Sequence, residues 1–201
     1  MRLYGSLTSP FVRKVRILIE EKALACTFVR ENPRLPESNA RRLSPLAKVP
    51  VLELDDGGAL HDSSVIVEYL DSLGQRRLVP SDPPARWSVL RLHALADGLM
   101  ESAIRVTLEG RRPESERHVD VVHWETQRIE RVLHALEKEP KKLPYFGSEM
   151  SLADIAVGVA LEYVDFRLTL DWRKRLPSLA GWLEPIARRA SFVKTAFSDV
   201  P

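Results

Sequence analysis

A serine followed by a proline, at the point where a strand pattern changes to a helical one, is the first feature of this chain that can support chemistry. Arg2-Leu3-Tyr4 alternates like a half-buried strand, and the apolar positions from Val12 onward fall on one helical face. Pro10 suits a first helical turn, so Ser9 is a candidate N-cap. Its hydroxyl would lie at the positive end of a helix dipole, a place that favours an anion. The alternative is that Ser9 only caps its own helix.

The segment Lys48-Val49-Pro50 is the second candidate, and it opens a strand pattern over 50–54. Proline cannot donate to a strand ladder, so it belongs at a strand start, and the Val49–Pro50 bond can be cis. A cis bond would turn the amide and carbonyl of Val49 outward, where they can pair with the backbone of a bound peptide. The alternative is a proline that only opens the strand.

The third candidate, Asp62-Ser63, stands at the expected start of a helix that ends near Gly74. At a helix N-terminus the Ser63 hydroxyl and backbone amides can hold a carboxylate, while Asp62 can accept from an ammonium group. The pair therefore suits the zwitterionic head of an amino acid. The alternative is plain helix capping by Ser63 or Ser64, with Glu68 close behind.

Composition and motifs argue against several other chemistries. The chain has 201 residues and a formal charge of +2 from 30 basic and 28 acidic residues, which is too balanced for a nucleic-acid or membrane-surface protein. The histidines form no HExxH pattern and Cys26 is the single cysteine, so we expect no metal site and no disulfide. A hydrolase elbow and a Gly-rich phosphate loop are both missing, which argues against a catalytic triad and a nucleotide cofactor. The lack of a signal-like or membrane-spanning run predicts a cytoplasmic location.

The elements that must position the candidates form a small mixed α/β domain over residues 1–77. The turn signal Asp55-Asp56-Gly57-Gly58 predicts an antiparallel hairpin between its flanking strands, the second of which includes Ala59-Leu60. A strand–helix–strand unit precedes it, so the sheet is expected to be mixed and four-stranded. The patterns predict strands near 2–5, 26–30 and 50–54, a helix over 10–23 and a short helix near 37–43.

The remainder of the chain reads as all-helical. A proline-rich stretch marks the boundary, with a linker over 78–83 and a second domain over 84–201. Ser151 with Asp154 is expected to form a capping box, and Pro140 and Pro144 to close the helix before it. Apolar spacing predicts a long helix through 87–108, a second over 119–136, a third from 152, and shorter ones around 178–190 and 192–197.

These motifs, in this order, resemble the glutathione S-transferase family. They are Ser-Pro-Phe-Val-Arg-Lys-Val-Arg-Ile from Ser9, Lys-Val-Pro-Val-Leu from Lys48, and Asp-Ser-Ser-Val-Ile-Val-Glu-Tyr-Leu from Asp62. The helical remainder fits as well, because Gly-Ser-Glu-Met-Ser-Leu-Ala-Asp-Ile over 147–155 looks like the family's capping-box segment. The chain looks closest to small bacterial members whose first helix opens with Ser-Pro-Phe. The resemblance implies a thioredoxin-like N-terminal domain, an all-helical C-terminal domain and a homodimer.

The resemblance also implies roles for individual residues. Ser9 stands where serine-type members keep the hydroxyl that hydrogen-bonds the glutathione sulfur, and where omega-type members carry a cysteine. The backbone of Val49, before Pro50, would pair with the cysteinyl residue of glutathione. Asp62 and Ser63 would hold its γ-glutamyl end.

Further residues are implied at the edges of this site. Lys48 would lie near the glycyl carboxylate, and Phe11 would wall the pocket. Tyr4 is the competing hydroxyl, because some branches of the family use a tyrosine at the end of the first strand. The second substrate's pocket would be lined by the helical domain, with Met100, Ile104 and Tyr163 as candidates.

The activity implied by the resemblance is attack of bound glutathione thiolate on an electrophilic small molecule, as in detoxification, with glutathione as co-substrate. Ser9 in place of a cysteine lacks the enzyme thiolate that exchange through a mixed disulfide needs. Two alternatives stay open. One is a non-catalytic module that binds glutathione or a protein partner, and the other is a glutathione-dependent peroxidase, reductase or dehalogenase.

Overall fold

The computed structural model describes residues 1–139, 141 and 145–199. Two compact units make up the chain: Met1–Val79 together with the segment that begins at Arg189, and Pro80–Arg188. The predicted division into 1–77 and 84–201 does not include this return of the C-terminal segment to the first unit. The domain bounds themselves stay a prediction.

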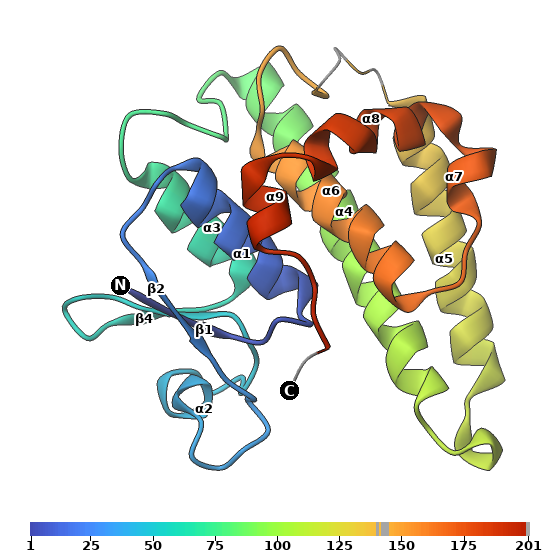
Figure 1. The fold of residues 1–201 in the computed structure, drawn as a ribbon, viewed down its shortest axis with the longest axis horizontal. Helices are drawn as coiled ribbons and strands as arrows, with labels where there is room; N and C mark the ends of the chain where they lie inside the picture. The colour runs from blue at the N-terminus through green and yellow to red at the C-terminus, as the bar shows by residue number, and fades with distance from the viewer. Residues whose placement is uncertain (140, 142–144, 200–201) are drawn as a thin grey trace. The chain divides into compact units, whose positions relative to one another are not determined.

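The first unit is built on a four-stranded sheet with the order β2-β1-β3-β4 (Figure 1). β1 pairs in parallel with β2 and antiparallel with β3, and β3 pairs antiparallel with β4 across the predicted turn. In that turn Gly57 has a φ of 87°, a conformation that glycine adopts without steric cost. The mixed sheet confirms the predicted thioredoxin-like fold. The strands are β1 (Arg2–Gly5), β2 (Thr27–Arg30), β3 (Val51–Glu53) and β4 (Ala59–Leu60).

Helices cover both faces of this sheet. They are α1 (Pro10–Glu21), α2 (Asn39–Leu43) and α3 (Ser63–Ser72), and α9 (Ala190–Lys194) packs on α1. α1 and α3 lie side by side over one face, and α2 lies against the other (Figure 1). Successive side chains of a strand point to opposite faces, so Leu3 points away from the α2 face. Tyr4 and Val51 lie on the α2 face, where they form a buried cluster with Ala40.

The end of β1 packs directly on the start of α1. A Cβ built on Gly5 would lie 2.5 Å from Cγ1 of Val12, closer than carbon atoms approach in proteins. A larger residue at Gly5 would therefore displace the helix. This contact fixes the loop of residues 6–9 that joins the strand to the helix.

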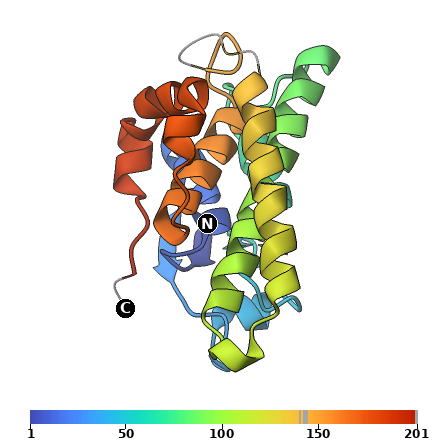
Figure 2. The same ribbon diagram turned by 90° about the vertical axis from the view of Figure 1, so that its right-hand side faces the viewer.

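The second unit is helical. It comprises α4 (Pro83–Gly110), a 3-10 turn at Glu114–Glu116, α5 (Val119–Lys138), α6 (Leu152–Arg167), α7 (Trp172–Arg175) and α8 (Pro177–Ala187). α4 packs against α5 and α6, and Figure 2 shows α4 beside α5. The capping box of Ser151 and Asp154 at the start of α6 is confirmed.

Pro140 and Pro144, expected to close α5, lie outside the described residues. α7 has no counterpart in the sequence prediction. None of the helices in the described part of the chain combines the length and apolar character that a bilayer crossing requires.

Candidate functional site

The strand directions bring the three candidate segments together at one edge of the sheet, the edge formed by the ends of β1 and β4 and the start of β3. β1 and β3 are antiparallel, so the loop that follows β1 lies beside the segment that precedes β3. β4 returns antiparallel to β3, so the helix start that follows β4 lies at this edge too. The fold therefore brings the segments of Ser9, Val49 and Asp62 to the same end of the first unit.

Ser9 is the N-cap of α1, as predicted. Its backbone is extended, with φ −84° and ψ 123°, and its Oγ accepts a hydrogen bond from Val12 N at 3.3 Å. Pro10 follows at the start of the helix. A hydroxyl can accept and donate at the same time, so this cap leaves the O–H of Ser9 able to donate to a ligand. The first turn of α1 has no acidic residue, so no carboxylate there offsets the positive end of the helix dipole.

The Val49–Pro50 peptide bond is cis, which is one of the two alternatives that the sequence leaves open. The Val49 side chain packs against the buried cluster of Tyr4, Ala40 and Val51. Neither the N–H nor the C=O of Val49 has a backbone hydrogen-bond partner within the described residues. The side chain thus anchors a segment whose backbone groups can pair with a peptide at the sheet edge.

Asp62 is the N-cap of α3, and Ser63 is the first residue of that helix. Oδ1 of Asp62 accepts from Ser64 N at 2.7 Å, so the cap is the aspartate and not the serine. Asp62 is exposed, whereas Ser63 is buried. Because a carboxylate accepts hydrogen bonds through two oxygens, this cap leaves Asp62 with capacity to receive an ammonium group.

Phe11 and Lys48 lie at the borders of these segments. Phe11 is half-buried in the first turn of α1, with Lys14 Nζ 5.6 Å from the centroid of its ring. Lys48 is exposed, immediately before Val49. Because the Lys48 ammonium is exposed, it can pair with an anionic ligand without first breaking a buried contact.

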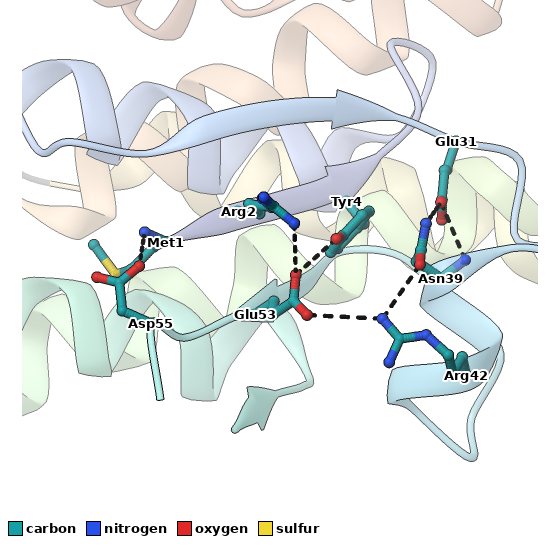
Figure 3. A network of polar contacts seen from close by, with 8 residues as sticks. All are labelled: Met1, Arg2, Tyr4, Glu31, Asn39, Arg42, Glu53 and Asp55. Carbon is teal, nitrogen blue, oxygen red and sulfur yellow. Dashed lines mark hydrogen bonds and ion pairs between the residues drawn. The ribbon is translucent and has the colours of Figure 1, made fainter. Parts of the chain in front are cut away.

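Tyr4 points to the α2 side of the sheet (Figure 3). Only 3% of the residue is exposed, and its hydroxyl donates to Oε2 of Glu53 at 2.7 Å. Arg2 and Arg42 approach the same carboxylate at 3.9 and 3.7 Å. Burial, and then the hydrogen bond to Glu53, raise the pKa of Tyr4. The phenol is therefore kept protonated and committed to a carboxylate of β3.

The candidates for the second substrate lie in the helical unit. Met100 has no exposed surface, Tyr163 is buried, and Ile104 is half-buried. Burial raises the pKa of the Tyr163 hydroxyl. Met100 and Tyr163 are thus core residues of this unit, and their part in a substrate pocket stays a prediction.

The described part of the structure supports neither a metal site nor a nucleophilic cysteine. In the described ranges no three side chains of His, Cys, Asp or Glu gather in a way that could hold a metal ion. Cys26 is half-buried, and burial raises the pKa of its thiol. A thiol of raised pKa is a poor nucleophile at neutral pH.

Glu31 is a residue at this edge that the sequence does not reveal. It follows β2, and its backbone N–H donates to Gly5 O at 2.8 Å, which extends the parallel ladder. Its carboxylate binds the start of α2, at Ser38, Asn39 and Ala40. The usual capping signal is a residue three positions away within the same helix start. Here the carboxylate lies seven to nine positions before its donors, so no local pattern identifies it.

Both parts of the chain match models of one protein family. The family model of the glutathione S-transferase N-terminal domain matches residues 3–77, and that of the C-terminal domain matches residues 111–184. An uncharacterized GST-like protein of Escherichia coli, YibF, is 34% identical over 197 residues, which is 97% of this chain and 98% of that protein.

Solved structures extend the similarity to the whole fold. A glutathione S-transferase from Methylobacillus flagellatus with GSH bound has a TM-score of 0.94 and 40% identity, covering 98% of this chain and 99% of that one. A family member from Pseudomonas fluorescens with bound glutathione has a TM-score of 0.89 and 35% identity, covering 98% of both chains.

Proposed function

This chain belongs to the glutathione S-transferase family, and we propose that it is a glutathione transferase that activates the thiolate of bound glutathione for attack on an electrophilic small molecule. The observation that carries this proposal is the Ser9 hydroxyl at the N-terminus of α1. It lies at the sheet edge that also holds the Val49 and Asp62 segments. Relatives of similar fold have been crystallised with glutathione.

Each part of the tripeptide has a partner of suitable chemistry at this edge. The backbone of Val49 pairs with the cysteinyl residue, as an added strand does. Asp62 accepts from the γ-glutamyl ammonium, and Ser63 with the amides of α3 receives the γ-glutamyl carboxylate. Lys48 faces the glycyl carboxylate, and Phe11 walls the pocket near the sulfur.

The sulfur then falls near Ser9. A thiol with a pKa near 8.5 is mostly protonated at neutral pH, and lowering that pKa by about two units requires roughly 2.7 kcal/mol of differential stabilisation. A hydrogen bond to an anion together with a helix N-terminus supplies energy of that order. In the reaction the sulfur forms the new bond to carbon, the leaving group departs with its electron pair, and the thiol proton passes to solvent.

The geometry favours Ser9 over Tyr4 as the hydrogen-bond donor to the glutathione thiolate. The Tyr4 hydroxyl is buried and already donates to Glu53 at 2.7 Å. To reach the sulfur it would have to give up this hydrogen bond and leave its buried position. The Ser9 hydroxyl can accept the capping hydrogen bond from Val12 N and at the same time donate its own hydrogen to the sulfur.

Calorimetry with glutathione tests the proposal, followed by turnover with a dinitrophenyl halide as electrophile. We expect the native protein to bind glutathione and form the thioether. Ser9→Ala should keep binding while turnover falls on the order of a hundredfold, as loss of a charge-stabilising donor does. Ser9→Thr, which keeps a hydroxyl and a cap, is the control.

Other outcomes of these assays would favour one of the two alternative functions. A native protein that binds glutathione but does not turn over the halide supports a non-catalytic module. Reduction of a hydroperoxide or disulfide in place of thioether formation supports a peroxidase or reductase. Light scattering tests the homodimer that we also propose, since a monomeric mass would contradict it.

A further inference from the structure

α2 is too short and too exposed to hold its own position at the site edge. It has five residues, of which only Ala40 is buried. Isolated helices of this length are unstable in water, because nucleation costs more than a few hydrogen bonds return. Its N-cap residue, Ser38, does not cap the helix with its own side chain in this fully described stretch. The support for α2 must therefore come from outside the helix.

Glu31 supplies that support at the N-terminus of α2 (Figure 3). Oε1 accepts from Asn39 N at 3.0 Å and from Asn39 Nδ2 at 2.6 Å. Oε2 accepts from Ala40 N at 3.0 Å and from Ser38 Oγ at 2.9 Å. One carboxylate thus satisfies two of the amide groups that a helix start leaves without partners, and it places a negative charge at the positive end of the helix dipole.

The protonation behaviour of Glu31 agrees with this geometry. Burial by itself would raise the pKa of Glu31, but the hydrogen bonds from Ala40, Asn39 and Ser38 outweigh it and lower the pKa. The carboxylate is therefore ionised at neutral pH and accepts all four hydrogen bonds.

The opposite end of α2 is held less firmly. Arg42 reaches Glu53 only at 3.7 Å, with 62% of its side chain exposed. It also donates to Asn39 Oδ1 at 3.2 Å. Exposed ion pairs of this kind contribute little to stability. Glu31 is the main polar anchor of α2 among the described residues.

α2 in turn supports the segment that carries Val49. Ala40 and Leu43 pack into the cluster that contains Tyr4 and Val51, and Val49 packs against the same cluster. The chain from α2 to Val49 is tightened by a turn, in which Leu46 N donates to Ser44 Oγ at 3.3 Å. A shift of α2 would therefore remove packing from Val49 and move Lys48 with it.

We infer that Glu31 is a positioning residue for glutathione. By holding α2 it keeps the Lys48–Val49 segment placed to receive the cysteinyl and glycyl parts of the tripeptide. The inference rests on the proposed function. It assigns no contact between Glu31 and the ligand, and the hydrogen-bond donor to the sulfur, Ser9, lies at the start of α1 and not on α2.

The experiment measures binding of two ligands, glutathione and γ-glutamylcysteine, to the native protein, Glu31→Ala, Glu31→Gln and Glu37→Ala. Glu37 is an exposed glutamate of the same loop and controls for the change in charge. We expect Glu31→Ala to weaken glutathione binding on the order of tenfold, because apparent affinity falls with the fraction of competent conformation. Glu31→Gln should lie between native and Glu31→Ala, and Glu37→Ala should match the native protein.

The dipeptide separates positioning from general damage. It lacks the glycyl residue that Lys48 would meet, so Glu31→Ala should weaken it less than it weakens glutathione. In the complex that still forms, the thiol pKa of bound glutathione should stay near the native value, because its hydrogen-bond donor, Ser9, lies on α1 and not on α2. Hydrogen exchange at the Ala40 amide should accelerate in Glu31→Ala.

Three outcomes would overturn the inference. Equal glutathione affinity in native protein and Glu31→Ala removes the positioning role while leaving the proposed function intact. Equal losses for both ligands, together with a raised thiol pKa, indicate general disruption of the unit. A native protein that binds no glutathione overturns the proposed function and the inference together.

Discussion

The two helices that flank the candidate site, α1 and α2, are held in place in different ways. α1 has twelve residues, most of them buried, and its own N-cap in Ser9. α2 has five residues, a single buried one, and depends on a carboxylate from the end of β2. The end of the site that would receive the thiol is therefore built into a long helix, whereas the end that would receive the glycyl residue depends on contacts from distant residues.

α1 is also anchored at its C-terminal end, through Glu21 and Lys22, and near its start, through Arg13. Lys22, its C-cap, donates to the backbone oxygen of Asp71 at 2.9 Å and pairs with the Asp71 carboxylate at 3.3 Å. Arg189 donates to both carboxylate oxygens of Glu21 at 2.9 and 2.7 Å. The guanidinium of Arg13 lies 4.3 Å from the ring centroid of Phe197. The Arg13 contact offsets part of the cost of a cationic side chain near the N-terminus of α1, where the dipole disfavours it.

The largest expected effect comes from removing the Asp71 carboxylate, which pairs with Lys22 at the C-terminal end of α1. Asp71→Ala leaves the Lys22 ammonium buried without its carboxylate partner, since the side chains of Lys22 and Asp71 are 3% and 4% exposed. It also removes the acceptor for the amides of Leu78 and Val79. We expect the free energy of unfolding to fall by about 3 kcal/mol, as for other broken buried ion pairs. Urea unfolding measures the change, with Asp55→Ala as the control, because the Asp55 side chain is 88% exposed. Equal midpoints for the two variants would contradict the prediction.

The parts of the fold that sequence predicts are those fixed by neighbouring residues. The cap at Ser9-Pro10, the strand-opening Pro50, and the turn at Asp55–Gly58 each depend on residues within a few positions. Local chemistry also placed the capping box of Ser151 and Asp154. All of these agree with the structure.

The parts that sequence does not predict depend on contacts between distant residues. Glu21 and Arg189 are separated by 168 positions, so nothing local indicates that the C-terminal segment packs on α1. α7 has no apolar periodicity, and it is fixed by the burial of Trp172, whose Nε1 donates to Asp165 at 2.7 Å. Glu31 is missed for the same reason, because it acts on a helix several residues further along the chain.

A smaller effect, which depends on pH, is expected at Glu21, the last residue of α1. Burial alone would raise the pKa of Glu21, but the hydrogen bonds from Arg189 and Ser191 outweigh it and lower the pKa. A lowered pKa stabilises the folded state above the unfolded value of about 4.3 and loses that contribution as the pH falls through the folded pKa. Glu21→Gln should cost about 1–2 kcal/mol at neutral pH.

Urea unfolding of Glu21→Gln across pH checks this prediction. The difference in unfolding free energy between native protein and variant should shrink as the pH falls below about 4.3, because the native carboxylate becomes protonated. A difference that stays constant down to acid pH would show that the glutamate acts through packing alone.

The smallest effect is expected at the weakly held end of α2. Arg42→Ala removes an ion pair at 3.7 Å whose arginine is 62% exposed. The free energy of unfolding should change by less than about 0.5 kcal/mol, and glutathione affinity by less than about twofold. Calorimetry beside Glu31→Ala provides the comparison. A loss as large as that of Glu31→Ala would mean that α2 is held from both ends.

The Ser9 hydroxyl is the proposed hydrogen-bond donor to the glutathione sulfur, and the proposed activity depends on it most directly. Its test is the thiolate absorbance of bound glutathione, titrated against pH in native protein, Ser9→Thr and Ser9→Ala. We expect the native complex to titrate about two units below the free thiol. Ser9→Thr should remain near the native value, and Ser9→Ala should return toward the free one by about one unit or more. An unshifted thiol in the native complex, or the same lowered pKa in Ser9→Ala, would contradict the account.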